Sequence, residues 1–127
     1  PNLRQVHLID DGYVALMRQR GFDLRPGDIG ENLLVEGIDL IALPADTRMR
    51  LGEDGAVIRL TGLRNPCIQM DRFLPGLMAA GLDRDDKGGL IRRTGVMAVV
   101  EQGGDVRPGD GVWVELPDAP WRGLEPV

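Results

Sequence analysis

Short apolar runs separated by glycine and proline are the feature that most restricts what this chain can fold into. The 127 residues include 18 glycines and 9 prolines, and the segments between them are rich in Val, Ile and Leu. Because glycine and proline supply the dihedral angles of tight turns, such spacing is typical of many short strands. The length suits one domain with its own hydrophobic core. The sequence therefore predicts a mainly β fold with short helices, in a single domain covering 1–127.

The apolar runs place expected strands along the whole chain. Runs of Val, Ile and Leu bounded by Gly, Pro, Asn or Asp are typical of strands. The expected strands cover residues 5–9, 29–36, 38–43, 48–51, 56–61, 96–100 and 111–116. The fourth and fifth of these flank Glu53-Asp54-Gly55, which predicts a hairpin.

Two short helices and two irregular segments complete the expected secondary structure. Asp11 is the expected cap of a helix over 11–20, and Gly21 is expected to end it. A second helix is expected over 73–80, with Pro75 near its start, where proline is tolerated. Residues 83–89 are expected to form a polar loop, and 118–127 a tail with Trp121 as its anchor.

The tetrapeptide Arg-Pro-Gly-Asp occurs twice, at residues 25–28 and 107–110. Pro-Gly presets the dihedral angles of a turn wherever it occurs. We therefore interpret the two copies as the same turn chemistry used twice. An internal duplication is the weaker interpretation, because no repeat of regular length accompanies them.

Charge and cysteine content exclude several classes of protein. The net charge is −5 with scattered acidic residues, which disfavours nucleic acid as a partner because binding phosphates needs a basic face. No stretch approaches the roughly 20 apolar residues of a membrane span. One cysteine forms neither an internal disulfide nor an all-cysteine zinc or iron–sulfur site, which predicts a cytoplasmic protein with a free thiol. The start at Pro1, without an initiator Met or a signal peptide, indicates a processed chain or a fragment.

Cys67 is the foremost candidate for chemistry. It ends the segment Arg64-Asn65-Pro66-Cys67, which follows an expected strand. Pro66 stiffens the backbone that leads to the thiol. A nearby cation such as Arg64 favours the thiolate, the form that attacks electrophiles and binds metals. Free cysteine is also among the most buried residue types, so a small core residue is an equally good interpretation from these residues alone.

Several polar residues are weaker candidates. His7 lies in an expected strand, where a half-buried, hydrogen-bonded role is more common than that of a base or ligand. The loop 27–32 combines two glycines with Glu31 and Asn32, and either approaches a ligand or satisfies its own backbone. The arginines near strand ends suit phosphate or carboxylate binding. They are Arg4, Arg64, Arg92 and Arg93.

These segments, taken in order, resemble the MOSC domain, which is similar to the C-terminal part of molybdenum cofactor sulfurases. The resemblance rests on Arg4-Gln5-Val6-His7-Leu8-Ile9, Gly30-Glu31-Asn32-Leu33, Glu36-Gly37-Ile38-Asp39-Leu40, Thr61-Gly62-Leu63-Arg64-Asn65-Pro66-Cys67, 95–100 and 106–110. It implies a mixed, β-barrel-like fold. It also implies that Cys67 is the family's cysteine, which ligates molybdenum in a pterin cofactor in relatives that reduce N-hydroxylated compounds.

The same resemblance implies a cofactor pocket and partners. The implied pocket residues are Arg4, Gln5, His7, Gly30, Glu31, Asn32, Arg64, Asn65 and Arg93. The leading hypothesis is a molybdenum-dependent reductase of N-hydroxylated compounds that receives electrons from a separate donor protein. In other members the cysteine is proposed to carry sulfur as a persulfide, which would make a cysteine desulfurase the partner. Pyridoxal phosphate binding is implied only by the family's association with cofactor sulfurases.

A third hypothesis is a non-catalytic binding or remnant domain. Family members usually carry a further N-terminal portion, whereas this chain begins three residues before Arg4. If that portion is missing, part of the barrel and of its pocket is missing too. This hypothesis predicts an unreactive thiol and no cofactor.

Overall fold

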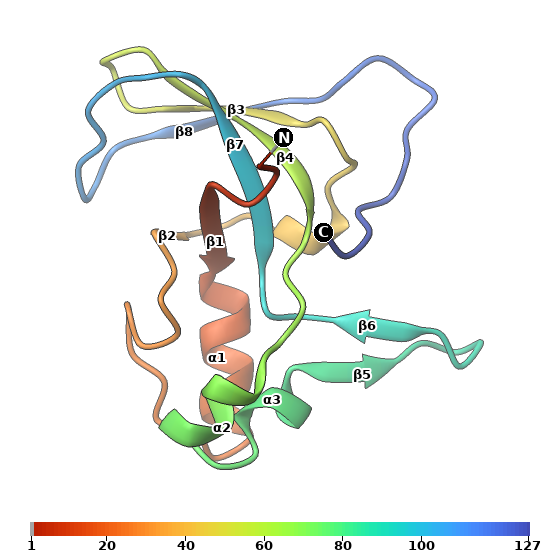
Figure 1. The fold of residues 1–127 in the computed structure, drawn as a ribbon. Helices are drawn as coiled ribbons and strands as arrows, with labels where there is room; N and C mark the ends of the chain where they lie inside the picture. Colours follow the sequence, from red (N-terminus) through yellow and green to blue (C-terminus); the bar gives the residue numbers. More distant parts are fainter. Residues whose placement is uncertain (1) are drawn as a thin grey trace.

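The computed structural model describes residues 2–127, which form a curled sheet with a helical layer at one end (Figure 1). The strands are Val6–Asp10 (β1), Leu33–Val35 (β2), Arg48–Leu51 (β3), Ala56–Leu63 (β4), Leu82–Arg84 (β5), Leu90–Arg92 (β6), Val96–Gln102 (β7) and Val112–Glu115 (β8). The helices are Asp11–Gln19 (α1), Ile68–Phe73 (α2) and Leu77–Ala80 (α3), with a 3-10 helix at Leu40–Ala42 (η1). The expected mainly β fold with short helices is confirmed.

Six strands form the main sheet in the order β2-β1-β7-β4-β3-β8. The predicted hairpin is β3–β4, in which Arg48 pairs with Arg59 and Leu51 with Ala56. β4 alternates buried and half-buried residues along its full length and pairs antiparallel with β7. β1 lies on the other side of β7, so the first strand of the chain and the end of β4 flank the same strand.

Two hydrophobic clusters fill the molecule. The first lies inside the curled sheet and includes Leu8, Met49 and Leu60. The second lies among the three helices and the end of β1, and its fully buried members include Met17 and Leu77. Burying side chains of this size stabilises the fold by about 1.5 to 3 kcal/mol each. Cys67 packs against the second cluster, at the helical end of the sheet.

The segment between α1 and β3 departs from the expected strands. Of residues 29–36 only Leu33–Val35 forms a strand, and residues 38–43 contain the 3-10 helix η1 instead of a strand. The expectation was wrong because apolar runs of this length do not distinguish strand from helical turn. A tertiary contact determines the conformation of this segment, since the Leu40 amide donates to the Asp10 carboxylate at 3.0 Å.

The region after Cys67 also differs from the prediction. The helix expected over 73–80 is two short helices, α2 and α3, and Pro75 lies in the turn between them. Proline disfavours helical dihedrals in the residue before it, and Leu74 is extended. The loop expected over 83–89 is the turn of a hairpin that was not expected, because β5 and β6 pair from Leu82 to Arg92. Residues 85–89 form this turn, in which the Asp85 carboxylate accepts from the Gly89 amide, and only Asp83 and Arg84 of the expected loop lie in a strand.

The two Arg-Pro-Gly-Asp segments form the same turn, as interpreted from the sequence. The Asp28 carboxylate accepts from the Arg25 amide at 2.8 Å. The Asp110 carboxylate accepts from the Arg107 amide at the same distance. Each aspartate therefore closes its own turn by bonding the backbone three residues earlier.

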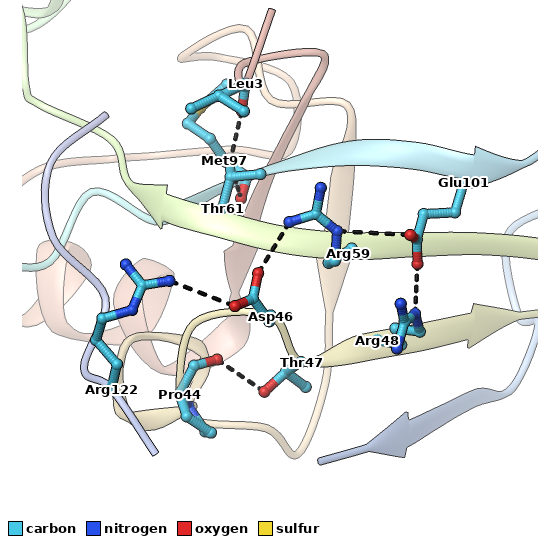
Figure 2. A network of polar contacts seen from close by, with 10 residues as sticks. All are labelled: Leu3, Pro44, Asp46, Thr47, Arg48, Arg59, Thr61, Met97, Glu101 and Arg122. Atoms are coloured by element: carbon cyan, nitrogen blue, oxygen red, sulfur yellow. Dashed lines mark hydrogen bonds and ion pairs between the residues drawn. The ribbon is translucent and has the colours of Figure 1, made fainter. Parts of the chain in front are cut away.

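The last residues lie beside the end of β4 and run in the same direction as it, and Figure 2 shows part of their attachment. Arg122 pairs with Asp46 at 3.3 Å, and Asp46 pairs with Arg59 at 2.9 Å. Leu124 packs against the sheet cluster, whereas Trp121, the expected anchor, is 60% exposed. Exposed ion pairs of this kind each contribute less than about 1 kcal/mol, so apolar packing and backbone bonding carry the attachment.

None of the helices within residues 2–127 has both the length and the apolar character needed to span a membrane.

The start of α1 gives a direct test of the capping assignment. The N-cap is Asp10 and not Asp11, because the Asp10 carboxylate accepts from the Tyr13 amide at 2.8 Å as well as from Leu40. Asp10→Ala is expected to lower the free energy of unfolding by about 2 kcal/mol. Asp11→Ala, the matched control, is expected to lower it by less than about 1 kcal/mol. Urea denaturation measures both, and equal losses would contradict the assignment.

Candidate active site

Cys67 lies in a pocket of about 280 Å³ at the helical end of the sheet. It is half-buried and immediately precedes α2, with an extended backbone. The residues that line the pocket are Asp28, Ile29, Gly30, Arg64, Cys67, Gln69, Met70 and Phe73. The loop after β4 thus brings the thiol into the same hollow as the backbone of the Gly30 turn, from a distant part of the chain.

Arg64 provides the positive charge of this pocket. Its Nη1 donates to the Ile29 carbonyl at 3.1 Å and to His7 Nδ1 at 3.2 Å. The hydrogen bonds and ion pairs among residues 2–127 leave its Nε and Nη2 without a partner. The Nε–Nη2 edge of a guanidinium is the edge that binds a carboxylate or phosphate through two parallel bonds. A half-buried cation without a carboxylate partner is suited to an anionic ligand.

His7 contacts Arg64 from within the sheet, and its side chain is buried, with only 5% of the residue exposed. Its Nε2 lies 2.9 Å from the Thr94 carbonyl. A carbonyl only accepts and an arginine only donates, so Nε2 carries the proton and Nδ1 accepts from Arg64. Burial lowers the pKa of His7 to about 4, the charges of Arg64 and Arg4 lower it as well, and the bond to Thr94 opposes them. His7 is therefore neutral at pH 7.

Only one residue of the Gly30-Glu31-Asn32 segment lines the pocket, and the other two hold the loop in place. Gly30 lines the pocket. The Glu31 carboxylate accepts from the Gly27 amide and so closes its own loop. The Asn32 side chain accepts from the His7 amide at 2.8 Å, and the Asn32 amide donates to the His7 carbonyl at 2.8 Å. Asn32 therefore fastens the loop to β1 beside His7.

The remaining candidates lie elsewhere. Gln5 accepts from the Val100 amide and lines a separate hollow beside β7. The Arg93 guanidinium pairs with Asp83 at 2.5 Å and lines another cavity with Asp10. Arg4 and Asn65 are exposed. The structure does not bring these four side chains into the Cys67 pocket.

Sequence reasoning missed several pocket residues. Asp28 and Ile29 lie in the candidate loop 27–32 but were not singled out within it, because the position of that loop depends on tertiary contacts. Met70 and Phe73 follow Cys67 at intervals of three, a helical spacing that would have pointed to them if α2 had been expected. Phe73 is 51% exposed and forms part of the pocket rim.

Comparison with known proteins identifies the family of this fold. The family model of the MOSC domain matches residues 2–113. The chain belongs to the MOSC domain family. No curated protein was found to match the sequence of this MOSC domain.

Solved structures share its fold at low sequence identity. The YuaD protein from Bacillus subtilis is 22% identical, with a TM-score of 0.74 over 92% of this chain. YiiM from Geobacillus stearothermophilus is 20% identical, with a TM-score of 0.71 over 88% of this chain. YiiM from Escherichia coli is 18% identical, with a TM-score of 0.67 over 94% of this chain. The likeness confirms the MOSC-type, barrel-like fold expected from the sequence.

The MOSC domain described here spans only part of those relatives. The aligned region covers 66% of the YuaD chain, 54% of the Geobacillus YiiM chain and 58% of the Escherichia YiiM chain. The residues matched to the family model include Cys67 and the whole pocket around it.

The MOSC family is associated with binding of the molybdenum cofactor, and the pocket residues can be tested against that group. Among residues 2–127, no cluster of three His, Cys, Asp or Glu side chains is arranged to hold a metal ion. A metal held here would take one thiolate from Cys67 and its other ligands from an organic group. The unpartnered edge of Arg64 suits a phosphate on such a group. The residues present therefore fit a metal that arrives within an anionic organic cofactor.

Proposed function

We propose that this MOSC domain binds a molybdenum–pterin cofactor through Cys67 and reduces N-hydroxylated compounds. The observation that carries the proposal is that a half-buried thiol and a guanidinium with no bond from its Nε or Nη2 belong to residues that line a single pocket. A thiolate is a ligand for soft metals, and a guanidinium binds phosphate.

The chain's own residues have separate roles in this proposal. Cys67 holds the metal, Arg64 binds the cofactor's anionic group, and Gly30 leaves room for close approach of a ligand to the backbone. Once bound, the cofactor supplies the two electrons that, with two protons, convert an N-hydroxyl group to N–H and water. The single cysteine of these 127 residues does not build an iron–sulfur cluster, so the electrons come from a donor outside this domain.

The activity test uses protein purified from a host that makes the pterin cofactor. With a chemical reductant, the unaltered protein is expected to reduce an N-hydroxylated amidine. Cys67→Ser is expected to lower the rate by more than about 100-fold, since loss of a ligand exceeds the effect of its supporting groups. Arg72→Gln, an exposed change on α2, is the control and should leave the rate unaltered. A Cys67→Ser protein as active as the control would contradict the proposal.

The half-exposed thiol favours a second candidate function, sulfur transfer through a Cys67 persulfide. In this case the partner is a cysteine desulfurase. The Cys67 thiolate attacks the outer sulfur of the desulfurase's cysteine persulfide, the S–S bond of that persulfide breaks, and the desulfurase cysteine leaves as a thiolate. Incubation with a desulfurase and cysteine, followed by mass spectrometry, tests it. One added sulfur atom on Cys67 in metal-free protein supports sulfur transfer, and an unmodified thiol contradicts it. A protein that binds neither sulfur nor cofactor would instead agree with a non-catalytic role.

A further inference from the structure

Arg64 needs a fixed orientation to act as a two-point anion site. A free arginine side chain has many rotamers, and ordering it costs up to about 2 kcal/mol. Both N–H groups of Nη1 are taken by protein acceptors, the Ile29 carbonyl and His7 Nδ1. This leaves the opposite, Nε–Nη2 edge for a ligand. The anchoring of Nη1 therefore decides where that edge points.

His7 is the more rigid of the two anchors. It lies in β1, inside the sheet, and its backbone is bonded to Asn32 in both directions. Its Nε2 is held by the Thr94 carbonyl at 2.9 Å. Gly95 packs directly against the His7 imidazole, since a Cβ at position 95 would lie 2.9 Å from Nε2. Ile29, by contrast, belongs to the loop between α1 and β2.

We propose that His7 is a positioning residue, whose neutral imidazole, protonated on Nε2, holds Nη1 of Arg64 so that the Nε–Nη2 edge faces the Cys67 pocket as a binding site for phosphate. His7 acts through Arg64 and does not itself touch the ligand. This differs from the contact with cofactor that the family resemblance implies for His7. The identity of the cofactor that carries this phosphate rests on the proposed function. The hydrogen bonds of His7 and Arg64 do not depend on it.

The test measures phosphate binding to the cofactor-free protein. Inorganic phosphate is titrated while the backbone amide signals of pocket residues such as Gly30 are followed by NMR spectroscopy, together with the Arg64 Nε–H signal in the proteins that keep Arg64. We expect saturable binding by the unaltered protein and none by Arg64→Gln. His7→Leu, which removes the acceptor, should weaken the affinity by about tenfold or more, the effect of losing one bond to a charged donor. His7→Gln keeps one donor and one acceptor and should restore most of the affinity.

Two results would overturn the proposal. The first is a folded His7→Leu protein that binds phosphate as tightly as the unaltered protein. The second needs no variant: the ¹⁵N shifts of the His7 ring report its tautomer, and a proton on Nδ1 would exclude the bond to Arg64. Neither measurement uses molybdenum, pterin or turnover. The positioning role of His7 can therefore fail while the proposed function stands, and the proposed function can fail while the role of His7 stands.

Discussion

Gly95→Ala is expected to lower the free energy of unfolding by roughly 4 kcal/mol, a large share of the stability of a small domain. Gly95 has a φ of +97°, a conformation that residues with a Cβ adopt only with strain. An added Cβ would also collide with the Leu8 carbonyl and come within 2.9 Å of both His7 Nε2 and an Ile9 methyl carbon. These atoms belong to β1, inside the sheet, so they have little freedom to move.

Gly21→Ala is the matched control for that prediction. Gly21 has nearly the same φ, +96°, but nothing lies within 4 Å of the position of an added Cβ. Its substitution is expected to cost about 1 to 2 kcal/mol from backbone strain alone. Urea denaturation of both variants separates strain from collision. Equal losses would show that the contact of Gly95 with β1 is not close.

The stability of the protein is expected to fall by about 3 kcal/mol between pH 7 and pH 4 because of His7 alone. Its pKa is about 4 in the folded protein, against an ordinary value of 6.5. Between these values the unfolded chain binds a proton that the folded protein does not. The contribution of His7 is therefore complete above pH 6.5 and is lost as the pH falls from 6.5 to 4.

The measurement is the difference in unfolding free energy between the unaltered protein and His7→Gln, followed by chemical denaturation from pH 7 to pH 4. Hydrogen bonds from Arg20 and Arg93 lower the pKa of Asp83, but that carboxyl titrates in both proteins and cancels in the difference. The free energy of unfolding of the unaltered protein minus that of His7→Gln should fall by about 3 kcal/mol between pH 7 and pH 4. A difference that does not change with pH would contradict the burial of a neutral His7.

The strand pattern of the sheet could be predicted because it is local. The hairpin has alternating apolar residues in β3 and an apolar start to β4 on either side of Glu53-Asp54-Gly55, and β7 begins with five apolar residues, Val96 to Val100. The η1 segment could not be predicted, since the bond between Asp10 and Leu40 decides its conformation across 30 residues of sequence. Likewise the division of α2 from α3 at Pro75 depends on a proline that a helix start would equally tolerate.

The reactive group of the candidate site could be predicted from the sequence, but the residues that orient the other side chains of the site could not. Cys67 stood out because Pro66 precedes it and Arg64 is nearby in the sequence. Cys67 and Arg64 do line one pocket. The orientation of Arg64 depends on His7, 57 residues away, and that of His7 on Thr94, 87 residues away. No sequence pattern connects these three residues. Arg93 was expected in the same pocket, and its side chain pairs with Asp83 outside it.

The molybdenum and pterin content of purified protein tests the central claim most directly. The unaltered protein and Cys67→Ser are produced side by side in a host that makes the cofactor, with Arg72→Gln as the control. Metal is measured by mass spectrometry and pterin by fluorescence after oxidation. We expect close to one molybdenum and one pterin per chain in the unaltered and control proteins, and loss of the metal from Cys67→Ser. Full retention of molybdenum by Cys67→Ser, or its absence from all three proteins, would contradict the account.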